Sequence, residues 1–221
     1  MICVLHLAPH PDDEVLGAGA TLLGLRAHGH RVINLACSLG RADQQERRRA
    51  EVGEACERAG FELVVHDPPL ALSSDDDPFG ARKALAATVE RLIADERVDL
   101  IVSPDRDDAH HAHKTVGEVA RTAGVPRWTW GLWRDLARPT IFSGFGDTRL
   151  AELQHVLAAH RGEVARNDYP ELLRARAIAA RVLGAERVFG FGSERRPEPY
   201  AELLADGGPP RVLDLADPLA A

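Results

Sequence analysis

Ligand-type side chains are concentrated in a short turn near the start of the chain. His10, Asp12, Asp13 and Glu14 fall within five residues, after the apolar run at residues 2–7. Imidazoles and carboxylates are common zinc ligands, and a catalytic zinc normally takes three protein groups and keeps one position for water. His10 and Asp13 could supply two of these groups. Adjacent side chains in an irregular turn point in different directions, which leaves Asp12 free to act as general base.

A structural explanation of the same acids is also open. Asp12 would cap a helix that begins here, and Asp13 and Glu14 would favour its first turn through the helix dipole. This explanation leaves His10 and the two flanking prolines without a role.

A second polar turn follows the apolar run 98–103 and contains several histidines. His110 and His113 are three residues apart, so they share a face once a helix has begun, whereas His111 should point elsewhere. One of the pair could bind a metal ion. The other, if Asp108 holds it protonated, could stabilise an oxyanion or donate a proton. A surface histidine-rich turn with adventitious metal binding is the alternative.

The elements that must position these turns alternate along the chain. Short apolar runs are separated by amphipathic stretches, which predicts βαβ units with right-handed crossovers. The expected fold is α/β, a Rossmann-like open, mainly parallel sheet with helices on both faces. The carboxyl ends of its strands meet at one edge, so the two turns should converge there. The predicted strands are 2–7, 31–37, 61–66 and 98–103, with helices at 15–29, 41–59, 80–96 and 115–123.

The two turns together resemble the PIG-L/LmbE family of zinc-dependent N-deacetylases. The likeness rests on Pro-His-Pro-Asp-Asp-Glu at residues 9–14 and His-x-x-His-x-x-x-Gly at residues 110–117. Weaker likenesses extend it over residues 1–205, as a single domain followed by a tail at 206–221. The resemblance implies removal of an acetyl or other acyl group from an N-acetylglucosamine-type small molecule.

The resemblance also implies residue roles. Zinc would be held by His10, Asp13 and His113. Asp12 would be the general base, and His110 the protonated partner that stabilises the oxyanion. Arg48 occupies a position that lies near the substrate in some members.

One departure from the family pattern concerns the second motif. Aspartate is usual just before the metal-binding histidine, and here that position is Ala112. A carboxylate that orients the ligand would then be missing unless Asp107 or Asp108 replaces it. A further acidic run, Asp75–Asp77, is better explained as a turn and helix cap than as a metal site.

The three tryptophans, Trp128, Trp130 and Trp133, lie within six residues. An indole face stacks well on a sugar ring, and Trp130 is the predicted substrate contact, although core packing or a subunit contact would explain the cluster as well. Further helices are expected at 150–160 and 171–183, and a strand or extended loop at 187–192. The tail from Asp206 is expected to be a mobile arm or a contact of a homo-oligomer.

Composition and charge limit the kinds of molecule that the protein is expected to bind and the compartment in which it is expected to work. A formal net charge of −7 leaves no basic excess for nucleic acid. The three cysteines show no close pairing in the sequence, which favours free thiols in a reducing compartment. No basic leader precedes the first strand, and no apolar run approaches the ~20 residues of a membrane span. A cytoplasmic location is therefore expected. Two alternatives remain: an amidase for another acylated metabolite or cysteine conjugate, and a non-catalytic metal- or nucleotide-binding protein.

Overall fold

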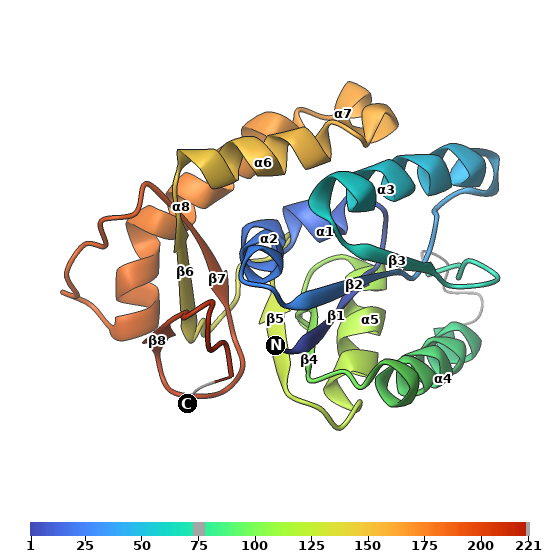
Figure 1. Cartoon of the computed structure of the whole chain (residues 1–221), viewed down its shortest axis with the longest axis horizontal. Coiled ribbons are helices and arrows are strands. Elements are labelled where there is room, and N and C mark those ends of the chain that lie inside the picture. Colours follow the sequence, from blue (N-terminus) through green and yellow to red (C-terminus); the bar gives the residue numbers. More distant parts are fainter. Residues whose placement is uncertain (73–77, 220–221) are drawn as a thin grey trace.

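Figure 1 shows the computed structural model, which describes residues 1–72 and 78–219. Asp75–Asp77 therefore lie outside the described residues. The centre of the fold is a five-stranded sheet in the order β3-β2-β1-β4-β5, with every neighbouring pair parallel. This confirms the predicted Rossmann-like α/β class. Its strands are β1 (Cys3–Ala8), β2 (Arg31–Ala36), β3 (Glu62–Val65), β4 (Leu100–Pro104) and β5 (Arg127–Trp130).

Helices cover both faces of this sheet, as Figure 1 shows. Alternate residues of β1 point to opposite faces, so Val4 belongs to one apolar cluster while Leu5 and Leu7 belong to the other. The helices between the strands are α1 (Asp13–Leu16), α2 (Gly19–Ala27), α3 (Gln45–Ala59), α4 (Pro78–Glu96) and α5 (His111–Arg121), with a 3₁₀ turn, η1 (Ala42–Gln44), before α3.

A second sheet, not predicted from the sequence, follows the first. It has three strands in the order β7-β6-β8, and it lies beside α8 (Figure 1). A bridge between Thr129 and Ala205 joins it to β5. The carboxylate of Glu202 on β7 accepts the backbone N–H groups of Ala20 and Thr21 and so caps α2. The elements of this half are β6 (Ile141–Phe145), α6 (Asp147–Leu157), α7 (Arg161–Arg166), α8 (Tyr169–Phe189), β7 (Tyr200–Leu204) and β8 (Arg211–Val212).

Two predictions for the C-terminal part need correction. Residues 187–192 are not a strand or extended loop throughout, because α8 continues to Phe189 and ends at Gly190, whose φ of 102° suits glycine. The tail is not a mobile arm, because β8 pairs with β6 and the carbonyl of Leu215 contacts His30 Nε2 at 2.9 Å. The last helix and the tail therefore complete the domain. The alternative role of the tail as a contact of a homo-oligomer stays a prediction.

Strand order determines where the two polar turns lie. β1 and β4 are adjacent, with Val4 opposite Leu100 and His6 opposite Val102. The connections after these two strands leave towards opposite faces of the sheet, and such a switch point is where open α/β sheets bind ligands. The turns after β1 and β4 therefore share one edge of the sheet.

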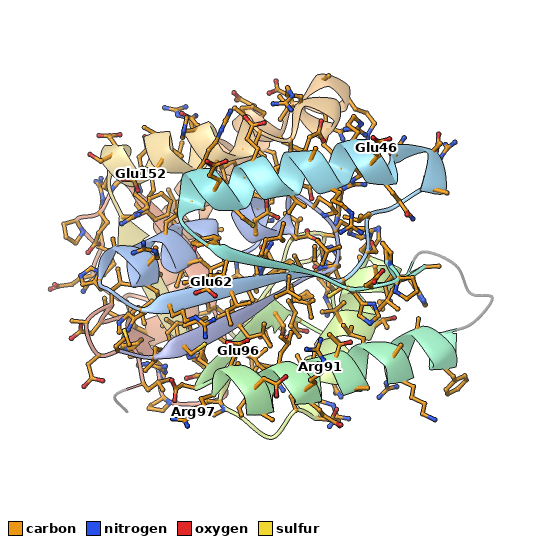
Figure 2. The ribbon with its side chains drawn as sticks, turned by 45° about the vertical axis from the view of Figure 1, so that its right-hand side comes forward. Glu46, Glu62, Arg91, Glu96, Arg97 and Glu152 are labelled. Atoms are coloured by element: carbon orange, nitrogen blue, oxygen red, sulfur yellow. The ribbon has the colours of Figure 1, made fainter. Side chains whose placement is uncertain are left out.

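Charged side chains cover the outer faces of the helices. In Figure 2, Glu46 on α3 and Glu152 on α6 lie on the outside of the molecule. The run of arginines after Glu46 is not one basic patch, because Arg49 is exposed whereas Arg48 is buried. Among the helices of the described chain, none has the length and apolar character needed to cross a bilayer.

Candidate metal centre

The turns after β1 and β4 bring three imidazoles together. One ring nitrogen from each of His10, His110 and His113 lies within 4.8 Å of the others. The carboxylate of Asp13 lies between two of these rings: Oδ1 is 3.4 Å from His113 Nε2 and Oδ2 is 3.4 Å from His10 Nδ1. Residues a hundred positions apart thus surround one point.

The chemistry of this donor set fits a metal ion. His113 is fully buried, and neither of its ring nitrogens has a hydrogen-bond partner among the described residues. The nearest acidic groups to these nitrogens are the carboxylates of Asp13, 3.4 Å from Nε2, and Asp108, 3.6 Å from Nδ1, so a cation beside Asp13 would give Nε2 a bonding partner. Two imidazoles and a carboxylate are a ligand set that zinc accepts in catalytic sites.

Asp108 supplies the carboxylate that the sequence left in doubt at position 112. It is buried, and its Oδ2 lies 3.6 Å from His113 Nδ1, on the side of the ring away from Asp13. Ala112 instead packs in the apolar cluster beneath α4 and α5. A carboxylate behind a ligating imidazole fixes the ring and increases its basicity, and here the loop before α5 provides it.

Asp12 is held in an unusual backbone conformation. Its φ is +106°, which non-glycine residues seldom adopt and which costs of order 1–3 kcal/mol. Within the described chain its carboxylate makes no capping hydrogen bond to α1, so the capping explanation is not supported. Burial, and then the neighbouring charge of Asp13, raise the pKa of Asp12 well above the ordinary range. Strain and a raised pKa both suit a residue that accepts protons.

A buried ion pair that sequence analysis missed supports the Asp12 turn. Glu14 Oε2 accepts the backbone N–H of Asp12 at 3.0 Å, and Glu14 Oε1 lies 2.5 Å from His160 Nε2. Both paired side chains are fully buried. Arg48 adds a third contact, donating from Nη2 to the carbonyl of Pro11 at 2.9 Å and lying 3.9 Å from Asp12 Oδ2. The sequence features that could have pointed to this pair were the acidic motif that contains Glu14 and the histidine-containing segment 159–161.

The electrostatics of the ligands already favour positive charge at the centre. Burial lowers the pKa of His113, but the carboxylates of Asp13 and Asp108 outweigh it and raise that pKa to about 10. Burial raises the pKa of Asp13, but its contacts with His113 and His10 hold the value well below the ordinary range. The carboxylates thus stabilise a cation between these rings.

His110 differs from the prediction that Asp108 holds it protonated. Asp108 Oδ1 accepts the backbone N–H of His110, not a ring N–H, at 3.0 Å. The His110 Nδ1 accepts the backbone N–H of Ala112 at 3.2 Å, and this requires an unprotonated Nδ1. Burial and the neighbouring imidazoles lower the pKa of His110 to about 4. His110 is therefore a neutral imidazole near pH 7, with its proton on Nε2.

A cavity of about 360 Å³ opens onto this centre. Of the two predicted substrate contacts, Arg48 lines this cavity, but Trp130 does not: it is only 1% exposed and packs its ring 5.3 Å from that of His113. The tryptophan that lines the cavity is Trp133. The other lining residues are Leu16, Gly40, Arg41, Gln44, Leu132, Glu163, Arg166 and Tyr169, besides His10, Asp12, Asp13, His110 and His113.

Comparison with known proteins agrees with this geometry. The family model described as "PIG-L: GlcNAc-PI de-N-acetylase" matches residues 5–124. A search of curated proteins gives no significant match. Among solved structures, the A40926 pseudoaglycone deacetylase Dbv21 has 18% identity and a TM-score of 0.73, covering 91% of this chain and 95% of its own.

Two further solved structures show how widely the fold is used. N,N'-diacetylchitobiose deacetylase from Pyrococcus horikoshii has 17% identity and a TM-score of 0.67, with 92% of this chain and 82% of the other covered. The 4-carboxy-2-hydroxymuconate hydratase GalB from Pseudomonas putida KT2440 has 18% identity and a TM-score of 0.59, with coverage of 97% and 99%. At these identities the likeness shows the fold alone, and the fold alone does not fix the reaction.

Proposed function

Because the chain belongs to the PIG-L family, whose model spans both polar turns, we propose that it is a zinc-dependent N-deacetylase of N-acetylglucosamine-type small molecules. The observation that carries the proposal is the convergence of His10, Asp13 and His113 on one point, next to the strained carboxylate of Asp12. The deacetylases of similar fold, which their names assign to the A40926 pseudoaglycone and to N,N'-diacetylchitobiose, support the substrate class. The three buried free thiols suit a reducing cytoplasm.

The ligand set that we propose is His10, Asp13 and His113, with Asp108 fixing the His113 ring. Zinc, when bound there, supplies Lewis acidity towards the amide carbonyl and makes water more acidic. His110 is left out of the set. Its Nδ1 accepts the backbone N–H of Ala112, so the proton of the neutral ring is on Nε2 and neither nitrogen has a free lone pair for zinc.

The protein side chains perform the proton transfers. Asp12 accepts a proton from the attacking water, and its raised pKa lets it keep that proton until the leaving amine takes it. His110, neutral and protonated on Nε2, donates a hydrogen bond to the oxygen on which negative charge develops. Arg48 holds the turn through Pro11 and keeps positive charge near Asp12.

Conversion of Asp12 to asparagine tests this assignment. Asparagine has the same shape and also tolerates a positive φ, so Asp12→Asn should fold and bind zinc as the wild type does. Turnover should fall by roughly 10²–10⁴-fold, the usual contribution of a general base. Amine release from acylated glucosamine derivatives, with the metal content of each preparation, measures both properties. Chelation followed by zinc addition should remove and restore wild-type activity.

Two results would reject parts of the proposal. Normal turnover in Asp12→Asn would remove the base assignment while leaving the ligand set. Activity that survives complete removal of metal would reject the zinc enzyme. A substrate panel that includes N-acylated cysteine conjugates and acylated natural products then decides whether the acyl group is carried by an amino sugar.

A further inference from the structure

We propose that Trp133 is the platform on which the substrate stacks a sugar ring, so that the cavity selects cyclic amino sugars over acyclic amides. This proposal rests on the proposed deacetylase function and specifies its substrate class. Of the three tryptophans, all of which are described, Trp128 and Trp130 are 2% and 1% exposed, whereas Trp133 is 52% exposed. Large exposed apolar side chains at a cavity mouth are characteristic of binding sites.

Trp133 stands directly beside the reacting groups. Its ring centroid is 6.2 Å from that of His110, and the two planes differ by 33°. In an N-acetylglucosamine-type molecule the amide nitrogen is bonded directly to the pyranose ring. A ring that lies on the indole therefore places its amide next to His110.

The backbone that carries Trp133 is fixed from two sides. Asp108 Oδ2 accepts the backbone N–H groups of Leu132 and Trp133, at 3.0 and 3.2 Å. On the other side, the guanidinium of Arg176 donates to the carbonyls of Gly131 and Leu132, the latter at 2.9 Å. An exposed side chain on a backbone held in this way is preorganised, which reduces the entropy cost of binding.

The same carboxylate joins the platform to the metal centre. Asp108 Oδ2, which accepts the backbone of Trp133, also lies 3.6 Å from His113 Nδ1. The positions of the indole and of a proposed metal ligand are thus set by one buried group. A tryptophan that only packed against apolar side chains would not need a hydrogen bond between its backbone and a carboxylate of the metal centre.

The rest of the cavity offers the polar groups that a sugar requires. Arg41, Gln44 and Arg166 line it with hydrogen-bond donors, and the ring of Tyr169 is also at its wall. A pyranose ring has an apolar C–H face and a rim of hydroxyl groups. An aromatic face combined with polar side chains matches both parts.

The test compares two substrates that differ mainly in the presence of a ring. The methyl glycoside of N-acetylglucosamine presents a pyranose face, whereas N-acetylglucosaminitol carries the same amide on an open chain, with free hydroxyl groups at C1 and C5 in place of the glycosidic and ring oxygens. Trp133→Ala should lower kcat/KM for the glycoside by about fivefold or more, mainly through KM, and Trp133→Phe should recover much of the loss. The loss for the alditol should be clearly smaller. Phe191→Ala removes another exposed aromatic ring, 97% exposed and outside the cavity, and is the matched control.

Binding of methyl glucosaminide, the expected product, provides a readout that does not depend on catalysis. Calorimetry should show weaker binding to Trp133→Ala than to the wild type, and the fluorescence change of the wild type should be lost in Trp133→Phe. Equal losses for glycoside and alditol, or unchanged product affinity in Trp133→Ala, would overturn the platform but not the deacetylase. Absence of hydrolysis in the wild type would instead reject the proposed function. Failure of the wild type to bind the glucosaminide would reject the platform.

Discussion

Replacement of His160 by alanine tests how the catalytic turn is held. His160 and Glu14 form a fully buried pair, with 2.5 Å between Nε2 and Oε1. The other oxygen of Glu14 accepts the N–H of Asp12, the residue with φ of +106°. Removal of the imidazole leaves the Glu14 carboxylate buried without its charge partner, and the strained turn loses its support.

The expected loss of stability is large. Removal of one member of a buried ion pair costs about 3–5 kcal/mol, because the remaining charge stays desolvated. Native domains of this size are stable by only ~5–15 kcal/mol. His160→Ala should therefore lower the free energy of unfolding by a substantial fraction. The double variant Glu14→Gln/His160→Ala should lose less unfolding free energy than the sum of the losses in the two single variants.

The pH dependence of the stability loss in His160→Ala distinguishes an ion pair from an uncharged packing contact. Burial lowers the pKa of His160, but the charge of Glu14 outweighs it and leaves the pKa above the ordinary value. A raised folded-state pKa means that the pair stabilises fully below about pH 6.5, the unfolded value, and that this contribution declines as pH rises through the folded pKa. The stability difference between wild type and His160→Ala should thus shrink as the solution becomes alkaline.

Urea unfolding of metal-free protein from pH 6 to 9, with both variants side by side, measures this difference. The slope contributed by groups that do not interact with His160 is common to both proteins and cancels. Asp12, whose pKa burial raises and the charge of His160 lowers, is the exception. A loss below about 1 kcal/mol, or a difference that does not change with pH, would refute the ion pair as we interpret it. In metal-loaded protein, kcat should fall more than KM changes, because the turn bearing Asp12 is displaced.

Two other predictions follow from the same region. Asp108→Asn should weaken zinc binding by about 10–100-fold in competition with a chelator, whereas Asp107→Asn, on an exposed neighbour, should bind zinc normally. Gly117→Ala should destabilise by roughly 1–3 kcal/mol in urea, because the added methyl would lie 2.7 Å from the backbone nitrogen of Arg106. Gly53→Ala is its control: its added methyl meets no described atom within 4 Å, so it should be neutral or stabilising.

Four of the five strands of the central sheet could be predicted because their signals are local. Each is a mainly apolar run, the crossovers between them are amphipathic stretches, and the handedness rule then leaves few topologies. The fifth strand, β5 (Arg127–Trp130), was not predicted, because it is short and alternates between polar residues and tryptophan. The second sheet lacked such signals. Its strands are five, five and two residues long, and β8 follows a Gly-Pro-rich segment that is typical of a loose tail. Pairing between β6 and β8, some 70 residues apart, cannot be inferred from either segment alone.

The candidate site was only partly predictable for a related reason. Residue types pointed to the candidate ligands, because few other side chains bind zinc. Partners at long sequence separation were missed, and the separation of 146 positions between Glu14 and His160 shows why. Among the tryptophans, alternation along β5 places Trp128 and Trp130 in the core, while Trp133 lies beyond the strand end. Because no strand was predicted at 127–130, nothing in the sequence indicated that Trp130 is buried and that Trp133 lines the cavity.

Asp108 shows how a departure from a motif can leave its chemistry intact. A carboxylate at position 112 would lie among the apolar side chains between α4 and α5, where Ala112 is fully buried. At position 108 the carboxylate instead reaches Nδ1 of His113 from the loop, and its oxygens also accept three backbone N–H groups. Burial raises the pKa of Asp108, but its contact with His113 and the backbone N–H groups of His110 and Leu132 outweigh burial and hold that pKa below the ordinary value. In this chain the loop residue Asp108, and not the residue at position 112, therefore provides the carboxylate that contacts the His113 ring.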